Sequence, residues 1–259
     1  MKILGITWNK SVLVSFDPYT GTIIETHAWP KPSENFVGLA YDYNRNKLYA
    51  LSQASCNLYS VDPITRDVNF IGKLNINGQD VSGLSYDPTN DTLYTMVLYF
   101  SSDYKNLRSE LAKVNINNAN ATVVGKIADG LGDSLCWREY DGQLNSYIAY
   151  GSGSWDCPYK ASIVSIEPTT AAMTTIFETS YHAITGLAKK PGQDAYFSWI
   201  NWTTHFYGEV NLNTKNITAR ANSDAVNVIS GAMIYRNFYV APAPNLPPCS
   251  FTDEDCLGS

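Results

Sequence analysis

Residues 47–74 read KLYALSQASCNLYSVDPITRDVNFIGKL and contain three short runs of alternating apolar and polar residues. The motif Asp62-Pro63-Ile64-Thr65 separates the second run from the third, because Asp caps such a turn and Pro fixes its φ angle. A fourth run, Val37–Tyr41, lies just upstream. Four short strands in about 45 residues are typical of one β-propeller blade. The stretch therefore predicts an antiparallel, four-stranded blade.

This unit recurs along the chain. Residues 2–29, KILGITWNKSVLVSFDPYTGTIIETHAW, align with residues 47–74 without a gap. The run upstream of the unit recurs around one glycine or serine, at Gly38, Gly83, Ser134, Gly186 and Gly231. These positions are separated by 45, 51, 52 and 45 residues. Because each such run supplies one innermost strand, we predict an all-β fold, a five-bladed β-propeller with four-stranded antiparallel blades.

The phase of the repeat predicts how the ring closes. The N-terminal unit supplies three strands but no inner strand, whereas residues 228–235 form an inner strand with no full blade after it. We expect residues 228–235 to pair with residues 3–7, which removes the open edge of a linear array. Alternatively, residues 238–240 form a hairpin with residues 228–235 and take the position beside them that we assign to residues 3–7. We predict one domain over residues 1–241 and a tail over residues 242–259.

Composition excludes some classes of protein. Among 259 residues, 18 Lys and Arg face 24 Asp and Glu, which gives a net charge of −6. This balance argues against nucleic-acid binding, which requires a basic surface. No apolar run is long enough to span a membrane. The surface chemistry of amides and hydroxyls favours a secreted, periplasmic or cell-surface protein, whose leader is absent from this chain.

The blade consensus supports a resemblance to a known group. GLAYD at residues 38–42, LYAL at residues 48–51 and LYSVDP at residues 58–63 resemble the repeats of uncharacterised bacterial secreted β-propeller repeat proteins. In blade number and length alone, the chain resembles the five-bladed lectin tachylectin. The resemblance implies a secreted propeller, and no site residues are carried over from it.

The cysteines suggest one disulfide. Cys249 and Cys256 flank six residues in the C-terminal tail and could form a small disulfide loop in an oxidising compartment.

Loops between second and third strands emerge on the same face as the links into the inner strands, and we call this the top face. We expect enlarged loops here over Val97–Ser109 and Gly151–Ala161, with Asn201–Phe206 in the equivalent place. Aromatic rings beside amides and carboxylates suit stacking on a sugar or gripping a peptide. The predicted ligand-binding residues are Tyr99, Tyr104, Trp155, Asp156, Tyr159, Trp202 and His205.

A second candidate lies where the inner strands begin, at the mouth of the central channel. Counting back from the repeat position in each inner strand places five residues at one level: Glu34, Gln79, Gly130, His182 and Asn227. Asp80 and Asp133 lie close by, so the predicted polar ring is Glu34, Asp80, Asp133, His182 and Asn227. Convergent polar groups suit a small ligand, and several oxygens suit a hard cation. Alternatively, these residues are solvated loop ends. We expect no cofactor apart from such a cation.

Two classes of function remain. The sequence favours a non-catalytic binding module that recognises carbohydrate or peptide through its top-face loops. The alternative is a glycosidase-like or lactonase-like hydrolase. A glycosidase requires two carboxylates about 5–9.5 Å apart, and the available pairs are Glu34 with Asp80 and Asp80 with Asp133. No Ser/His/Asp spacing argues for nucleophilic catalysis.

Overall fold

In the part of the chain that it describes, the computed structural model shows 20 strands. It describes residues 2–7, 12–17, 19–28, 34–53, 55–101, 106–150, 160–181, 184–190, 193, 195–200, 206–220 and 228–234. The strands are β1 (Lys2–Thr7), β2 (Val12–Phe16), β3 (Ile23–Ala28), β4 (Phe36–Asp42), β5 (Lys47–Ser52), β6 (Asn57–Val61), β7 (Val68–Lys73), β8 (Asp80–Asp87), β9 (Thr92–Phe100), β10 (Leu107–Val114), β11 (Ala121–Ala128), β12 (Leu131–Arg138), β13 (Gln143–Tyr150), β14 (Lys160–Ile166), β15 (Met173–Thr179), β16 (Ile184–Lys189), β17 (Ala195–Ile200), β18 (Phe206–Asn211), β19 (Asn216–Arg220) and β20 (Val228–Ile234). In these ranges we find no helix long and apolar enough to cross a membrane.

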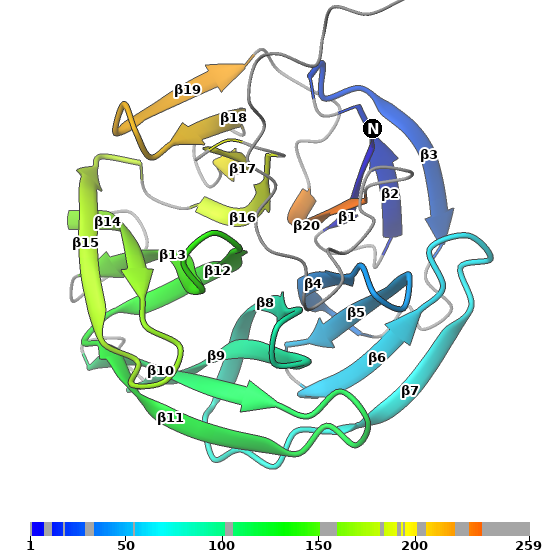
Figure 1. Ribbon diagram of the computed structural model, residues 1–259, viewed down its shortest axis with the longest axis horizontal. Coiled ribbons are helices and arrows are strands. Elements are labelled where there is room, and N and C mark those ends of the chain that lie inside the picture. Colours follow the sequence, from blue (N-terminus) through cyan, green and yellow to red (C-terminus); the bar gives the residue numbers. More distant parts are fainter. Residues whose placement is uncertain are drawn as a thin grey trace, which may run out of the picture.

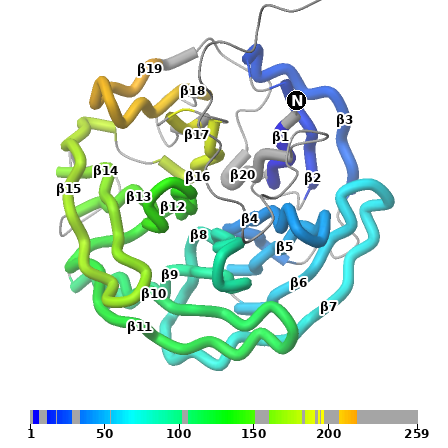
Figure 2. The backbone as a smooth tube through the Cα atoms, in the orientation of Figure 1, coloured from blue at the N-terminus to red at the C-terminus, as the bar shows by residue number. Residues whose placement is uncertain are grey.

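The strands form five antiparallel sheets of four strands each, arranged in a ring (Figure 1). The sheets follow one another around the ring in chain order, as the coloured tube in Figure 2 shows. The inner strands β4, β8, β12, β16 and β20 each contact the next, and β20 contacts β4. The predicted five-bladed propeller is therefore confirmed.

The ring closes between the two ends of the chain. Strand β20 pairs with β1 in the order β20-β1-β2-β3 (Figure 1). In the register of this pair, Ile3 lies opposite Met233 and Gly5 lies opposite Gly231. This confirms the predicted closure, with β1 beside the returning strand. Tyr235 and the tail over residues 242–259 lie outside the described residues.

Burial falls from the axis to the rim. Every residue of the inner strand β4 is buried, whereas the outer strands β3, β7 and β15 consist of half-buried and exposed residues. This gradient follows from the sequence, because the inner strands carry apolar residues on both faces and the outer strands are rich in Thr, Glu and Asn. Polar outer strands also discourage pairing with another chain.

Adjacent inner strands approach very closely at the repeat glycine. A Cβ atom at Gly38 would lie 2.5 Å from the Cβ of Leu84, and one at Gly83 would lie 2.9 Å from the backbone nitrogen of Leu135. The pairing register shifts next to this position in four blades, from β4–β5 to β16–β17. Each shift marks a β-bulge, which bends the inner strand.

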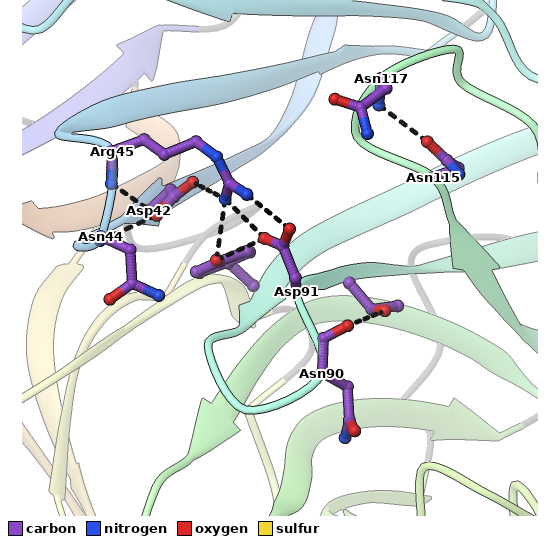
Figure 3. Close-up of polar contacts among 9 residues, drawn as sticks. Asp42, Asn44, Arg45, Asn90, Asp91, Asn115 and Asn117 are labelled. Atoms are coloured by element: carbon purple, nitrogen blue, oxygen red, sulfur yellow. Dashed lines mark hydrogen bonds and ion pairs between the residues drawn. The ribbon is translucent and has the colours of Figure 1, made fainter. Parts of the chain in front are cut away.

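The face opposite the top face carries the turns from first to second and from third to fourth strands, and we call it the bottom face. Asp17 and Asp62 each accept hydrogen bonds from two backbone N–H groups of their own turn, as the Asp-Pro motifs predict. Arg45 on this face joins two blades (Figure 3). Its guanidinium bonds Asp42 in its own turn at 2.9 Å and Asp91 of the next blade at 2.5 Å. These contacts are structural and face away from the candidate site.

One predicted loop is shorter than expected. Residues 97–109 were expected to form an enlarged loop, but β9 extends to Phe100 and β10 begins at Leu107. Pairing of Tyr99 with Arg108 and of Phe100 with Leu107 continues the hairpin. This prediction was therefore wrong in its bounds, because cross-strand side-chain pairs stabilise the extended ladder.

We predict that removal of residues 228–259 lowers the melting temperature sharply and causes aggregation, because it exposes the backbone edge of β1. Thermal unfolding and light scattering measure both effects. The matched control removes only residues 242–259 and should melt close to the full chain. If the longer truncation melts like the control, closure by β20 does not hold the ring.

Candidate functional site

A groove opens on the top face at the third blade, which consists of β8 to β11. It lies where β9 ends and β10 begins, beside the links into β8 and β12, and its volume is about 550 Å³. The lining residues are Gln79, Tyr99, Phe100, Ser101, Asn106, Leu107, Arg108 and Asp129. Tyr99 is thus the predicted ligand-binding residue that the structure places in a concave surface.

Three side chains hold one wall of this groove in a fixed arrangement. The Arg108 guanidinium lies over the Tyr99 ring, with its carbon 4.4 Å from the ring centre. Glu110, on the same strand as Arg108, accepts a hydrogen bond from the Tyr99 hydroxyl at 2.9 Å and pairs with Arg108 at 2.5 Å. Burial and the bond to Glu110 raise the pKa of Tyr99. The ring is therefore neutral and oriented in advance, with one face covered by Arg108.

The opposite wall is held by backbone contacts. The Phe100 N–H donates to the side-chain oxygen of Gln79. The Gln79 N–H donates to the carbonyl oxygen of Leu98 at 3.0 Å, which extends the strand pair beyond β8. Ser101 and Asn106 close the short loop through two hydrogen bonds of 3.1 Å. Phe100 and Leu107 are half-buried in the groove, and the amides of Gln79 and Asn106 are exposed beside them.

Glu34, which the sequence places in the channel-mouth ring, is held by hydrogen bonds within its own blade. Its carboxylate accepts them from β5, from β6 and from the link between these strands. The donors are the hydroxyls of Ser52, Ser55 and Tyr59 and the amide of Asn57. Burial opposes the charge, but these hydrogen bonds dominate and lower the pKa of Glu34. Glu34 is therefore a stable anion that fixes a loop.

Asp80 begins β8, and its place at the channel mouth stays a prediction. Its carboxylate accepts a hydrogen bond from the Gln53 side chain at 2.6 Å and one from the Val81 N–H at 2.8 Å. Burial raises its pKa despite these two donors.

Asp133 on β12 is the most perturbed carboxyl group described. One oxygen accepts hydrogen bonds from the Ser82 hydroxyl at 2.9 Å and from the Ser134 N–H at 3.0 Å. Burial raises the pKa of Asp133 to about 7, and the charge of Asp80 acts in the same direction. Perturbed groups of this kind gather at functional sites, although structural networks produce them too.

Four leucines directly follow the repeat position on successive inner strands. Leu39, Leu84, Leu135 and Leu187 are all buried. They line a cavity of about 50 Å³ together with bottom-face residues such as Tyr43 and Lys189.

Several predicted residues lie outside the described part of the chain. They are Tyr104, Trp155, Asp156, Tyr159, His182, Trp202, His205, Asn227, Cys249 and Cys256. Their roles, including the disulfide, stay predictions. In the described residues, Cys56 and Cys136 are free thiols, and no three His, Cys, Asp or Glu residues lie close enough to hold a metal ion.

Sequence reasoning missed Arg108, Glu110, Ser82 and Thr185. Arg108 and Glu110 are two residues apart on β10 and therefore lie on the same face of the strand, and Arg108 is paired with Tyr99. This arrangement can be recognised only when the register of the hairpin is known. Ser82 and Thr185 occupy the same place before the repeat glycine as Asp133 occupies before Ser134. The repeat alignment therefore contained a signal for these two residues.

Comparisons with known proteins define the fold but no family. No protein-family model matches the chain, and no curated protein matches it in sequence. A chain in the crystal structure of a nidogen/laminin complex superposes with a TM-score of 0.63 at 10% identity, covering 90% of this chain and 82% of that one. TolB from Acinetobacter baumannii superposes with a TM-score of 0.51 at 10% identity, over 84% of this chain and 52% of its own. This protein thus spans about half of TolB, and likeness at such low identity shows the β-propeller fold alone.

The raised pKa of Asp133 predicts a specific pH dependence of stability. An unfolded aspartate titrates near pH 4, so between about pH 4 and pH 7 the folded protein binds the extra proton. Protonated Asp133 therefore makes its full contribution to the free energy of unfolding below pH 4, and this contribution is lost as the pH rises through 7. From pH 5 to pH 8, the wild type should lose roughly 1–3 kcal/mol more unfolding free energy than Asp133→Asn.

Urea unfolding at the two pH values measures this difference. Asp67→Asn, which removes an exposed carboxylate on the bottom face, is the matched control and should follow the wild type. Parallel pH profiles for the wild type and Asp133→Asn would show that Asp133 titrates normally.

Proposed function

We propose that this protein is a non-catalytic binding module that holds a peptide segment of a protein partner in the groove at the third blade. The observation that carries the proposal is the arrangement of Tyr99, Arg108 and Glu110, fixed before any ligand arrives. Rigid side chains lose little conformational entropy on binding, which favours affinity. The half-buried Phe100 and Leu107 supply apolar contact area beside them.

A peptide fits this groove better than a sugar does. Arg108 covers one face of Tyr99, so that face is not open to a stacked sugar ring. The exposed amides of Gln79 and Asn106 and the carboxylate of Asp129 suit the polar groups of a peptide backbone and its side chains. One structural neighbour comes from a complex of nidogen with laminin, which is an assembly of proteins. Carbohydrate binding through the predicted aromatic loops is the alternative.

The hydrolase alternative rests on Asp80 and Asp133. A neutral acid beside a second carboxylate is one arrangement of acid–base catalysis. Against it, both groups are engaged by hydrogen bonds from the protein, and Glu34 is bound within its own blade. We therefore favour binding.

Selection from a phage-displayed peptide library and screening on a glycan array, both with the full chain, test the proposal. We expect peptides to be selected. Their affinity should fall by about 1–3 kcal/mol in Tyr99→Ala and in Phe100→Ala, as for interface anchors. Tyr140→Ala is the matched control, because Tyr140 is 63% exposed on the bottom face and also lies beside an arginine, Arg138, at 5.0 Å.

Three outcomes would contradict the proposal. An equal loss in Tyr140→Ala would show that the effect is not specific to the groove. Glycan binding that depends on Tyr99, without selected peptides, would favour a lectin. Hydrolysis of a glycoside or lactone that is lost in Asp133→Asn would identify an enzyme.

A further inference from the structure

Arg108 on β10 lines the groove at the third blade and pairs with one carboxylate. One of its guanidinium nitrogens, Nη2, lies 2.5 Å from Oε1 of Glu110, and the other Glu110 oxygen accepts a hydrogen bond from the Tyr99 hydroxyl. Among the residues that the structure describes, no second carboxylate pairs with Arg108. A guanidinium has five N–H donors and no acceptor. Donors of Arg108 therefore remain for a ligand in the groove.

Another arginine of this chain holds two carboxylates at once. Arg45 on the bottom face pairs with Asp42 in its own turn and with Asp91 of the next blade (Figure 3). Nη1 lies 2.9 Å from Asp42, and both Nη atoms lie 2.5 Å from the two oxygens of Asp91. The side chains of Arg45 and Arg108 are exposed to a similar degree, 41% and 46%. Arg108 thus has a carboxylate partner in its own blade but lacks the second partner that Arg45 has.

The guanidinium of Arg108 is held in place before a ligand arrives. Tyr99 lies directly opposite it in the register of β9 and β10, and the guanidinium carbon lies 4.4 Å from the centre of the Tyr99 ring. Glu110 binds both the Tyr99 hydroxyl and Arg108, so the three side chains hold one another. A planar guanidinium matches the two oxygens of a carboxylate. Because this one is already oriented, binding costs little side-chain entropy.

The charges around the groove favour a ligand with a single negative charge. Asp129 also lines the groove, and Lys126 contacts both of its oxygens, at 2.6 and 2.7 Å. Arg108 with Glu110 and Lys126 with Asp129 form two pairs that together have no net charge. A phosphate group has almost two negative charges. Glu110 and Asp129 would repel it more strongly than they repel a carboxylate.

We propose that Arg108 binds a carboxylate of the peptide that lies in the groove, beside an apolar residue that contacts Phe100 and Leu107. This inference rests on the proposed function and narrows its ligand to peptides with a carboxylate at this place. The carboxylate belongs to an Asp or Glu side chain or to the C-terminus of the peptide, because both have the same planar geometry. It gives Arg108 the second carboxylate that Arg45 already has.

Two matched pairs of acetylated dipeptides test the site. N-acetyl-Leu-Glu amide and N-acetyl-Leu-Gln amide differ in a side-chain carboxylate, whereas N-acetyl-Gln-Leu acid and its amide differ in a C-terminal carboxylate. Each is titrated into the isotopically labelled full chain at constant ionic strength, followed by amide chemical shifts. We expect saturable shifts around residues 79, 99–101 and 106–108. In at least one pair the acidic member should bind about fivefold more tightly, as for an exposed ion pair, and that pair identifies the source of the carboxylate.

Variants separate the carboxylate contact from the general shape of the groove. In Arg108→Gln the advantage of the acidic dipeptide over its neutral partner should disappear, and Arg108→Lys should retain part of it, because lysine lacks the planar fork. Any disturbance of the groove weakens both members of a pair, so the ratio of their affinities reports the contact itself. Lys47→Gln removes one exposed positive charge where β5 begins, on the bottom face, and as the matched control should keep the wild-type ratio.

Equal affinities within both pairs of dipeptides would overturn this inference, and so would a ratio that survives in Arg108→Gln. Inorganic phosphate that binds around residues 106–108 more tightly than the acidic dipeptides would also overturn it. If peptides selected from the library depend on Tyr99 and Phe100 while neither acidic dipeptide exceeds its neutral partner, the proposed function stands and the carboxylate assignment fails. If no peptide is selected and no dipeptide binds, both fail.

Discussion

The close approach of neighbouring inner strands is the constraint on which the structure depends. At the repeat glycine, a side chain would collide with the next strand, as the 2.5 Å from a Cβ at Gly38 to Leu84 shows. At Gly83 the backbone also adopts a φ of +64°, which side chains disfavour. Buried leucines directly follow this position on four successive inner strands, at Leu39, Leu84, Leu135 and Leu187. The top face carries the groove at the third blade.

This constraint explains why the fold could be read from the sequence. A glycine or serine marks each inner strand because the close approach of the neighbouring strand requires a small residue there. Leucine follows it in four of the five strands, and Ala232 follows Gly231 in the fifth. Counting these marks gave five blades, and their phase gave the closure of β20 on β1. Ser134 departs from the pattern and adopts a φ of +62° without being glycine. The sequence shows that serine replaces glycine at position 134, but it does not show the backbone conformation that Ser134 adopts.

The candidate site was less predictable, because it depends on side chains that meet across segments. Asp80 and Asp133 could be placed near one level by counting, whereas the direction of Glu34 depends on four donors in its own blade. The groove wall depends on the register that places Tyr99 opposite Arg108, and alternation within one strand does not fix a register.

The central claim is that the top face at the third blade binds the ligand. Hydrogen–deuterium exchange of the full chain, with and without a selected peptide, tests it most directly. We expect slower exchange within residues 79–82 and 98–110, with no change in the bottom-face turns at residues 43–46 and 88–91. Protection confined to those bottom-face turns would contradict the account and move the binding surface to the opposite face of the propeller.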